Sequence, residues 1–111
     1  MIVRTLRLVP PPGRRLAVLE ILRSVQGQAA TQPGCAARHI YEEAGPEPAV
    51  VLVEQWESKP ALEAHLGSEA HRRVLDAVEL SGASSEVRYD HVTESEGMEL
   101  IERVRLGAQP R

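Results

Sequence analysis

The chain has few aromatic side chains and almost no cysteine from which to build a stable core. Its 111 residues contain no phenylalanine, one tryptophan and two tyrosines, so the hydrophobic core must be mainly aliphatic. The single cysteine, Cys35, excludes an internal disulfide and is consistent with a reducing compartment. A chain of this length suits one domain with a modest core.

Long apolar runs and clustered positive charge are also missing. No apolar stretch is long enough for a transmembrane helix, and the segment from Met1 to Val9 is too short, and too interrupted by arginines, for a signal peptide. The formal net charge is −3, and the arginines are scattered among acidic residues, which argues against a nucleic-acid-binding surface. We therefore expect a cytoplasmic protein with no membrane partner and no nucleic-acid partner.

The compact motifs that bind metals or nucleotides are absent as well. There is no His-x-x-x-His, no Cys-x-x-Cys, no acidic calcium loop and no glycine-rich phosphate loop. His65 and His71 would lie about 240° apart around a continuous helix, and Gly67 interrupts that helix, so they do not form a ligand pair. We expect neither a metal site nor a cofactor.

Hydrophobic periodicity predicts four strands and two helical regions. Helical spacing of Leu16, Leu19, Leu22 and Val25 predicts a first helix, and Val74, Leu75 and Val78 form the predicted buried stripe of the second. The strands are expected at about residues 1–9, 35–43, 50–56 and 85–93, and the helices at about 14–30 and 58–80, the latter interrupted at Gly67. The order β-α-β-β-α-β predicts an α+β, ferredoxin-like fold with a four-stranded antiparallel sheet and both helical regions on one face.

Apolar side chains occupy both faces of the predicted strands. Neighbouring strand residues point in opposite directions, so Ile2 and Val3, Leu8 and Val9, and the run 50–53 supply both faces. The helices cover only one of them. A second subunit is the simplest cover for the other, and each buried aliphatic side chain would add ~1.5 to 3 kcal/mol. We predict a homodimer in which residues 1–94 form the domain and residues 95–111 form an arm that packs on the partner.

The only tryptophan lies where the third strand runs into the second helical region. Ser58 is placed to cap this helix, and Pro60 falls in its first turn, where a missing amide donor costs little. Trp56 and His65 are therefore expected to lie close together, at the edge of a pocket between sheet and helix.

Several short motifs together resemble the antibiotic biosynthesis monooxygenase (ABM) domain family over roughly residues 1–93. The resemblance implies ferredoxin-like subunits that pair into a dimeric α+β barrel, with a pocket between each sheet and its helices. Characterised relatives oxidise phenols or quinols with molecular oxygen and without metal, flavin or haem, others degrade haem, and many have no assigned substrate. The matching residues are Pro33-Gly34-Cys35, Glu54-x-Trp56-x-Ser58, Leu62-x-Ala64-His65-x-x-Ser68 and His71.

The resemblance suggests a cofactor-independent monooxygenase that oxidises a quinol or a polycyclic phenol. Such a substrate must lose a proton before its anion can pass an electron to oxygen, so the site needs a base and a hydrogen-bond donor. His65 and His71 are the candidate catalytic residues, because histidine titrates near neutral pH. Trp56 is the candidate that flanks the substrate. Strand residues that could bind the substrate through hydrogen bonds are Tyr41, His39, Tyr89, Arg88 and His91.

Other interpretations of these residues remain open. Trp56 can equally be the large core residue of a chain without phenylalanine, and His65 can serve only to cap backbone carbonyls. The chain contains no asparagine, a residue that well-known members of the family use. The haem-degrading branch has tryptophan where this chain has His65, and histidine where it has Leu75. The alternatives are a non-catalytic dimeric module that binds a small aromatic compound or has a structural role, and a haem-degrading monooxygenase.

Overall fold

A computed structural model describes residues 1–107, and its four strands form one antiparallel sheet. The strands are β1 (Ile2–Leu8), β2 (Cys35–Glu42), β3 (Val50–Trp56) and β4 (Ser85–His91), in the spatial order β2-β3-β1-β4. Each neighbouring pair runs antiparallel. This strand order, with helices after β1 and after β3, confirms the predicted ferredoxin-like α+β fold.

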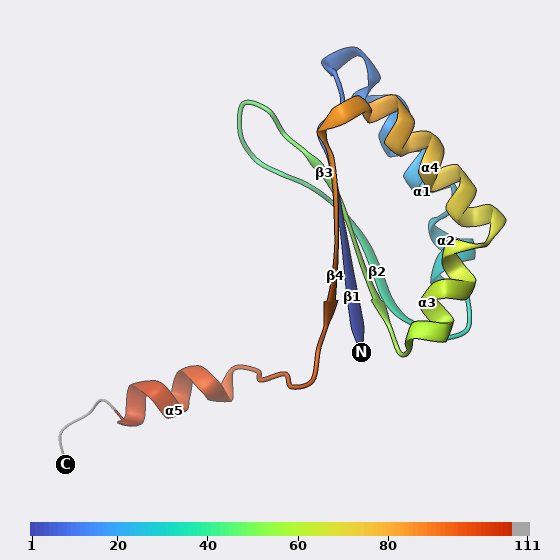
Figure 1. The fold of residues 1–111 in the computed structure, drawn as a ribbon. Coiled ribbons are helices and arrows are strands. Elements are labelled where there is room, and N and C mark those ends of the chain that lie inside the picture. The colour runs from blue at the N-terminus through green and yellow to red at the C-terminus, as the bar shows by residue number, and fades with distance from the viewer. Residues whose placement is uncertain (108–111) are drawn as a thin grey trace.

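All the helices that follow β1 and β3 lie on the same side of the sheet (Figure 1). They are α1 (Arg15–Ser24), α2 (Gln26–Ala30), α3 (Lys59–Leu66) and α4 (Glu69–Ser81), with short 3₁₀ turns η1 (Pro12–Arg14) and η2 (Gly82–Ser84). The first predicted helix is divided at Val25. The second is divided at Gly67, and Ser58 and Ser68 cap its two parts by accepting hydrogen bonds from the amides of Ala61 and His71.

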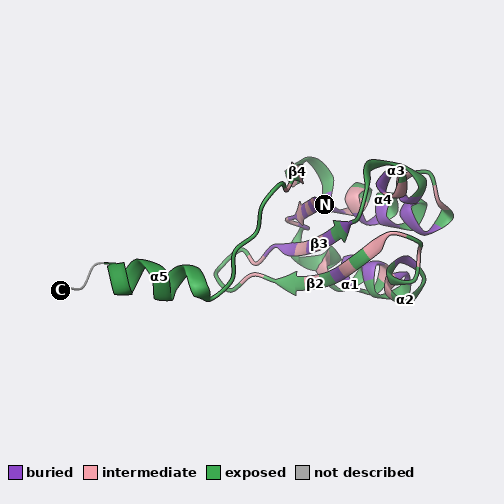
Figure 2. Ribbon diagram, turned by 90° about the horizontal axis from the view of Figure 1, so that it is seen from below, coloured by how far each residue is buried: buried purple, intermediate pink, exposed green. Residues whose placement is uncertain are grey.

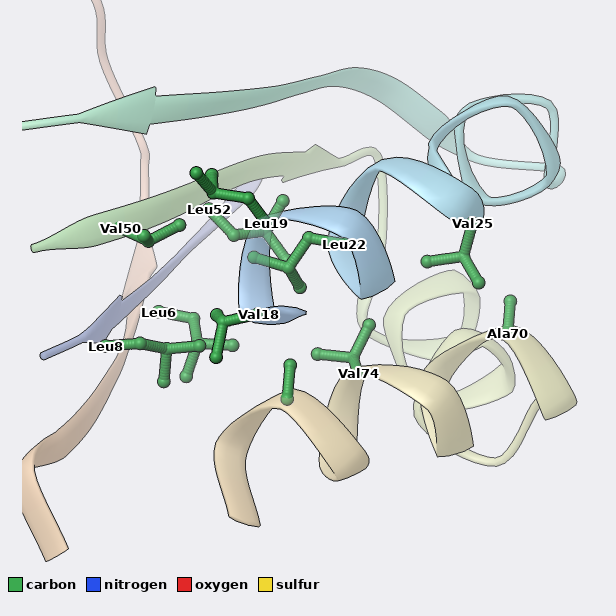
Figure 3. Packing of buried hydrophobic residues seen from close by; sticks show 11 residues of the cluster. Leu6, Leu8, Val18, Leu19, Leu22, Val25, Val50, Leu52, Ala70 and Val74 are labelled. Carbon is green, nitrogen blue, oxygen red and sulfur yellow. The ribbon is translucent and has the colours of Figure 1, made fainter. Parts of the chain in front are cut away.

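The core between the sheet and the helices is aliphatic, as the composition predicts (Figure 3). Leu8 and Leu52 from the sheet pack against Leu22 of α1 and Val74 of α4. The predicted helix stripes were too wide. Leu16 and Leu75 are 65% and 52% exposed, because at about 100° per residue each lies more than a quarter turn from the centre of its helix's buried face.

The sheet face opposite the helices is open, and the chain leaves β4 to form a separate helix, α5 (Glu99–Gly107). In both views α5 stands away from the sheet and from the other helices (Figures 1 and 2). Every residue of α5 is exposed, including Ile101 and Val104. The predicted arm, residues 95–111, therefore contains a helix, and its last four residues lie outside the described part of the chain. Within residues 1–107 no helix has the length and apolar character needed to cross a membrane.

Candidate functional site

Strand alternation carries charged side chains to the covered face of the sheet. Arg4 follows the buried Ile2 by two positions in β1, and Glu54 lies between the buried Leu52 and Trp56 in β3. The strand register places Glu54 opposite Arg4 on one side and opposite Arg38 of β2 on the other. All three charged side chains are buried. They form an ion cluster beneath the helices.

Glu54 is the centre of this cluster. Its Oε1 accepts a hydrogen bond from Arg4 Nη1 at 3.0 Å, and its Oε2 accepts one from Arg38 Nε at 3.0 Å. Burial acts to raise the pKa of Glu54, but contact with His65, the positive charge of Arg4 and the Arg38 hydrogen bond outweigh it and lower the pKa to about 2. Arg38 Nη1 also donates to the side chain of Gln26. Glu54 is therefore ionised and shared between two guanidinium groups.

His65 of α3 links the ion cluster to the tryptophan. Its Nε2 lies 3.2 Å from Glu54 Oε2, although the alignment is poor for a hydrogen bond, and its Nδ1 is hydrogen-bonded to the side-chain oxygen of Gln32. Its ring stacks on the indole of Trp56, with centroids 4.7 Å apart and planes 24° apart. The predicted proximity of Trp56 and His65 is confirmed. Both ring nitrogens of His65 already face protein groups, so this imidazole offers no free nitrogen to a substrate.

His71 of α4 is held in one neutral form. Arg4 Nη2 lies 2.8 Å from His71 Nε2, and because a guanidinium can only donate, Nε2 must accept and Nδ1 must carry the proton. Burial and the positive charge of Arg4 lower the pKa of His71 to about 4. Nδ1 has no hydrogen-bond partner. At neutral pH, His71 is therefore an uncharged hydrogen-bond donor rather than a proton acceptor.

Arg4 and His71 line a cavity of about 290 Å³, which we name the α4–β4 cavity. The ring of Tyr89, from β4, lies 5.8 Å from the guanidinium carbon of Arg4 and forms part of the wall. The cavity combines one fixed positive charge, one neutral donor and one aromatic ring within an apolar wall. Its other lining residues are Leu6, Leu75, Val78, Ser85, Glu86 and Val87.

Other cavities are larger but lie away from this chemistry. One, of about 670 Å³, is at the end of the sheet where β1 leaves it, and prolines such as Pro11 and Pro48 make up much of its wall. Its one arginine, Arg15, already pairs with Glu42. A second, of about 450 Å³, lies beside α3 and reaches His65 and Gln32, whose side chains are bonded to each other. We therefore place the candidate site at the α4–β4 cavity.

The remaining predicted site residues do not join the cluster. His39 and Tyr41 of β2 lie on the open face, with ring centroids 6.0 Å apart. Arg88 of β4 also points to the open face, where its Nε donates to Asp90 at 2.9 Å. His91 ends β4 on the same face as Tyr89 and is exposed. Their roles in substrate binding stay predictions. Within residues 1–107, no three histidine, cysteine or carboxylate side chains are arranged to hold a metal ion.

Sequence reasoning missed the arginines and the glutamate that organise the site. The sequence did contain a signal for Arg4 and Glu54. Side chains alternate between the two faces of a strand, so Arg4 lies on the same face as Ile2 and Leu6, and Glu54 on the same face as Leu52 and Trp56. A charged residue on the face of a strand that is otherwise buried indicates a buried ion pair or a functional group.

Solved structures of other proteins share this fold. The Rv0793 protein of Mycobacterium tuberculosis is 24% identical, with a TM-score of 0.77 over 86% of this chain and 98% of its own. A candidate antibiotic biosynthesis monooxygenase from Deinococcus radiodurans is 14% identical, with a TM-score of 0.79 over 88% and 98%. Another from Nitrosomonas europaea is 18% identical, with a TM-score of 0.76 over 85% and 100%. At these identities the likeness establishes the fold alone.

Sequence comparison identifies the family. No curated protein sequence matches this chain. The family model described as "Antibiotic biosynthesis monooxygenase" matches residues 1–77, which include β1, the ion cluster, Trp56 and both helical histidines. With more than half of its length matched, the chain belongs to the antibiotic biosynthesis monooxygenase (ABM) family.

Proposed function

We propose that this protein is a cofactor-independent monooxygenase that oxidises a phenol or quinol with molecular oxygen in the α4–β4 cavity. The observation that carries the proposal is the pairing of Arg4 with His71, each with an unpartnered N–H group, beside the ring of Tyr89. Apolar walls favour an aromatic ring, and the two donors favour an oxygen that becomes negatively charged.

The donors explain how such a site would work without a strong base. A positive charge and a hydrogen-bond donor beside a phenol stabilise its anion, which lowers the phenol's pKa. The released proton can then pass to water. Because His71 is already protonated on Nδ1 and accepts from Arg4 on Nε2, its role here is donation. Arg4 and His71 would supply the polar contacts for which this sequence has no asparagine.

The reaction can be written for 1-naphthol as a test substrate. The naphtholate passes one electron to O₂, which gives a naphthoxyl radical and superoxide. These combine at the ring carbon para to the oxygen, and the proton lost at the start returns to the peroxide. The O–O bond then breaks as water leaves with the hydrogen from that carbon, and 1,4-naphthoquinone remains. One oxygen atom enters the product and the other leaves as water.

Trp56, His65 and Glu54 act in this proposal as positioning residues. Glu54 fixes Arg4 Nη1, and His65 holds Glu54 from the helix side while it stacks on Trp56. None of the three lines the α4–β4 cavity. Their effect on the reaction would come through the orientation of Arg4, since a misplaced donor loses much of its effect on the developing charge.

We also propose that the protein works as a homodimer. In support, the open face of β1 and β3 carries Val3, Val51 and Val53, and nothing in the described chain covers it (Figure 1). The apolar side of α5 is also without a covering surface. A second copy applied to the open face would bury aliphatic area, and α5 would gain a surface to pack on.

Oxygen consumption with 1-naphthol tests the proposed reaction. The protein should consume O₂ faster than the buffer does, and ¹⁸O₂ should place one labelled atom in the quinone. His71→Leu, which removes the donor, should lower the rate at least about tenfold. Arg72→Gln, an exposed change on the next residue of α4, is the matched control and should not alter it.

A rate equal to autoxidation would overturn the oxygenase proposal for this substrate class. Saturable naphthol binding under argon together with such a rate would favour the non-catalytic binding module instead. Release of hydrogen peroxide without label in the product would indicate an oxidase rather than a monooxygenase.

A further inference from the structure

The ion cluster carries more positive than negative charge. Arg4 and Arg38 contribute two positive charges, and Glu54 contributes one negative charge, which it shares between them. His71 adds none, because it is neutral above about pH 4. An uncompensated charge is costly away from water. Among these buried groups, one positive charge therefore lacks a counter-charge from the protein.

Two residues that line the cavity, Arg4 and His71, each keep one buried N–H group without a hydrogen-bond partner. Arg4 uses Nη1 on Glu54 and Nη2 on His71, and its Nε has no partner. His71 uses Nε2, and its Nδ1 has no partner. Both residues are at least nine-tenths buried, and both line the α4–β4 cavity. Buried polar groups in folded proteins are normally paired, so two unpartnered donors on residues that line one cavity point to a ligand acceptor.

Among residues 1–107, no second carboxylate is placed to neutralise them. The only acidic residue of the cavity wall is Glu86, which is exposed and stands opposite Arg7 in the β1–β4 pair. It therefore lies at the rim and on the side of the strand that faces away from the cluster. A negatively charged ligand would supply the charge that the site lacks.

The size of the cavity limits the ligand. About 290 Å³ is at the lower end of the range for small-molecule sites. One or two fused rings fit such a volume better than the polycyclic phenols that the sequence resemblance suggests. Leu75 and Val87 would contact the faces of the ring system, and the ring of Tyr89 would lie near its edge or face.

We propose that the α4–β4 cavity binds a one- or two-ring aromatic compound as its anion, with an ionised oxygen, phenolate or carboxylate, held by Arg4 Nε and His71 Nδ1. This inference takes its site from the proposed function and names the form in which the ligand binds. Binding is measured under argon, so the anion preference can hold or fail independently of any turnover.

A nitrophenol reports its own ionisation by colour and provides the first test. 4-Nitrophenol is titrated with excess wild-type protein at one pH unit below the midpoint of the free dye. The bound dye should show the yellow spectrum of nitrophenolate, because the donors favour its anion. A bound spectrum of the neutral phenol would overturn the proposal, as would the absence of any binding of the dye.

A matched pair of ligands separates charge from shape. 2-Naphthoate and 2-naphthalenemethanol have the same ring system, and only the first is charged. In calorimetric titrations naphthoate should bind at least about tenfold more tightly, which is the effect of a hydrogen bond to a charged group. Equal affinities, together with a bound nitrophenol in its neutral form, would overturn the proposal. If nitrophenol binds as its anion but naphthoate binds no more tightly than naphthalenemethanol, the site is specific for phenolates. If the anion is preferred in both tests, the site accepts phenolate and carboxylate oxygens alike.

A variant of Arg4 tests whether this residue causes the preference for the anion. Arg4→Met removes the charge and keeps a long flexible side chain, and it should reduce naphthoate affinity at least about tenfold. Arg72→Gln removes an exposed arginine close by and should leave the affinity unchanged. Unchanged binding in a folded Arg4→Met protein would overturn the proposal. Should this variant fail to fold, the spectral and paired-ligand tests on wild-type protein decide the question.

Discussion

The imidazole of His65 stacks on the indole of Trp56 and, at its other edge, lies 3.2 Å from the carboxylate of Glu54. One side chain therefore joins the aromatic contact at the end of β3 to the buried ion cluster in its middle. Mutations of Trp56 and of Glu54 should therefore have non-additive effects on stability, because these two residues and His65 pack together without exposure to water.

Truncation of the tryptophan should be among the most damaging single changes. Trp56 is fully buried, so Trp56→Ala should lower the free energy of unfolding by about 3 to 5 kcal/mol through the cavity it leaves. Trp56→Phe should cost less, because a phenyl ring fills much of the space that alanine leaves empty and the indole N–H has no partner to lose. Urea unfolding followed by circular dichroism measures both. Equal costs for the two variants would show that the lost volume does not set the cost of truncation.

Removal of the central carboxylate should leave two buried arginines without their counter-charge. Glu54→Gln is expected to lower the free energy of unfolding by about 3 to 5 kcal/mol. Glu43→Gln is the matched control, because Glu43 pairs with Arg7 at the surface and its loss should have a much smaller effect. Chemical denaturation at pH 7 compares them. A Glu54 variant as stable as the Glu43 variant would contradict the account of the cluster.

The depressed pKa of His71 should make stability depend on pH. The folded pKa is about 4 and the usual value is 6.5, so between these values the unfolded chain binds a proton that the folded chain does not. The free energy of unfolding should therefore fall as the pH is lowered from 6.5 to 4, by on the order of 1 to 3 kcal/mol. The difference between wild type and His71→Gln, measured in urea at several pH values, isolates this contribution. A difference that does not change with pH would mean that His71 titrates normally.

Gly34 should tolerate no side chain. Its φ is +86°, and a Cβ there would lie 2.4 Å from the Cβ of Ala61 in α3. Gly34→Ala should therefore destabilise the protein by about 1 to 3 kcal/mol and disturb the contact between the β2 end and α3. Gly27→Ala is the control, since that glycine is within α2 and a Cβ meets nothing within 4 Å. The control should be neutral or slightly stabilising, as helix propensity favours alanine. Thermal unfolding distinguishes the two.

The open face of the sheet should mediate self-association. Sedimentation equilibrium at micromolar concentration is expected to give the mass of a dimer. Val51→Glu places a charge on the open face and should produce monomers, with loss of stability. Leu16→Glu changes an exposed leucine on the helix side and should leave the dimer intact. A well-folded monomeric wild type would overturn the dimer proposal.

The sequence carried enough information for the fold. Strand alternation, proline and glycine breaks and serine caps predicted four strands and two helical regions near the observed positions. The errors concern which side of an element is buried. Leu16 and Leu75 are hydrophobic and were therefore assigned to the core, whereas small residues such as Ala70 and Ala77 fill it on α4. Packing of helices against a sheet decides this, and hydrophobicity alone does not.

The candidate site was only partly predictable. Trp56, His65 and His71 could be found because they stand at a recognisable strand-to-helix junction. Arg4, Arg38 and Glu54 could not be grouped from sequence, because their contact depends on three strands that are adjacent in the sheet but far apart in the chain. The direction of proton donation at His71 depends on the Arg4 guanidinium, so its role as a donor needed coordinates.

The central position of β1 has a consequence for synthesis. β1 is made before its two neighbours in the sheet, which begin only at residues 50 and 85. A nascent chain must therefore hold this apolar segment without either neighbour until β3 has left the ribosome, and with one edge unpaired until β4 follows. Assembly of the sheet depends on contacts between distant parts of the sequence, which makes folding slower than in helical proteins of similar size. Premature termination before β4 would release a product with one side of its middle strand exposed to aggregation.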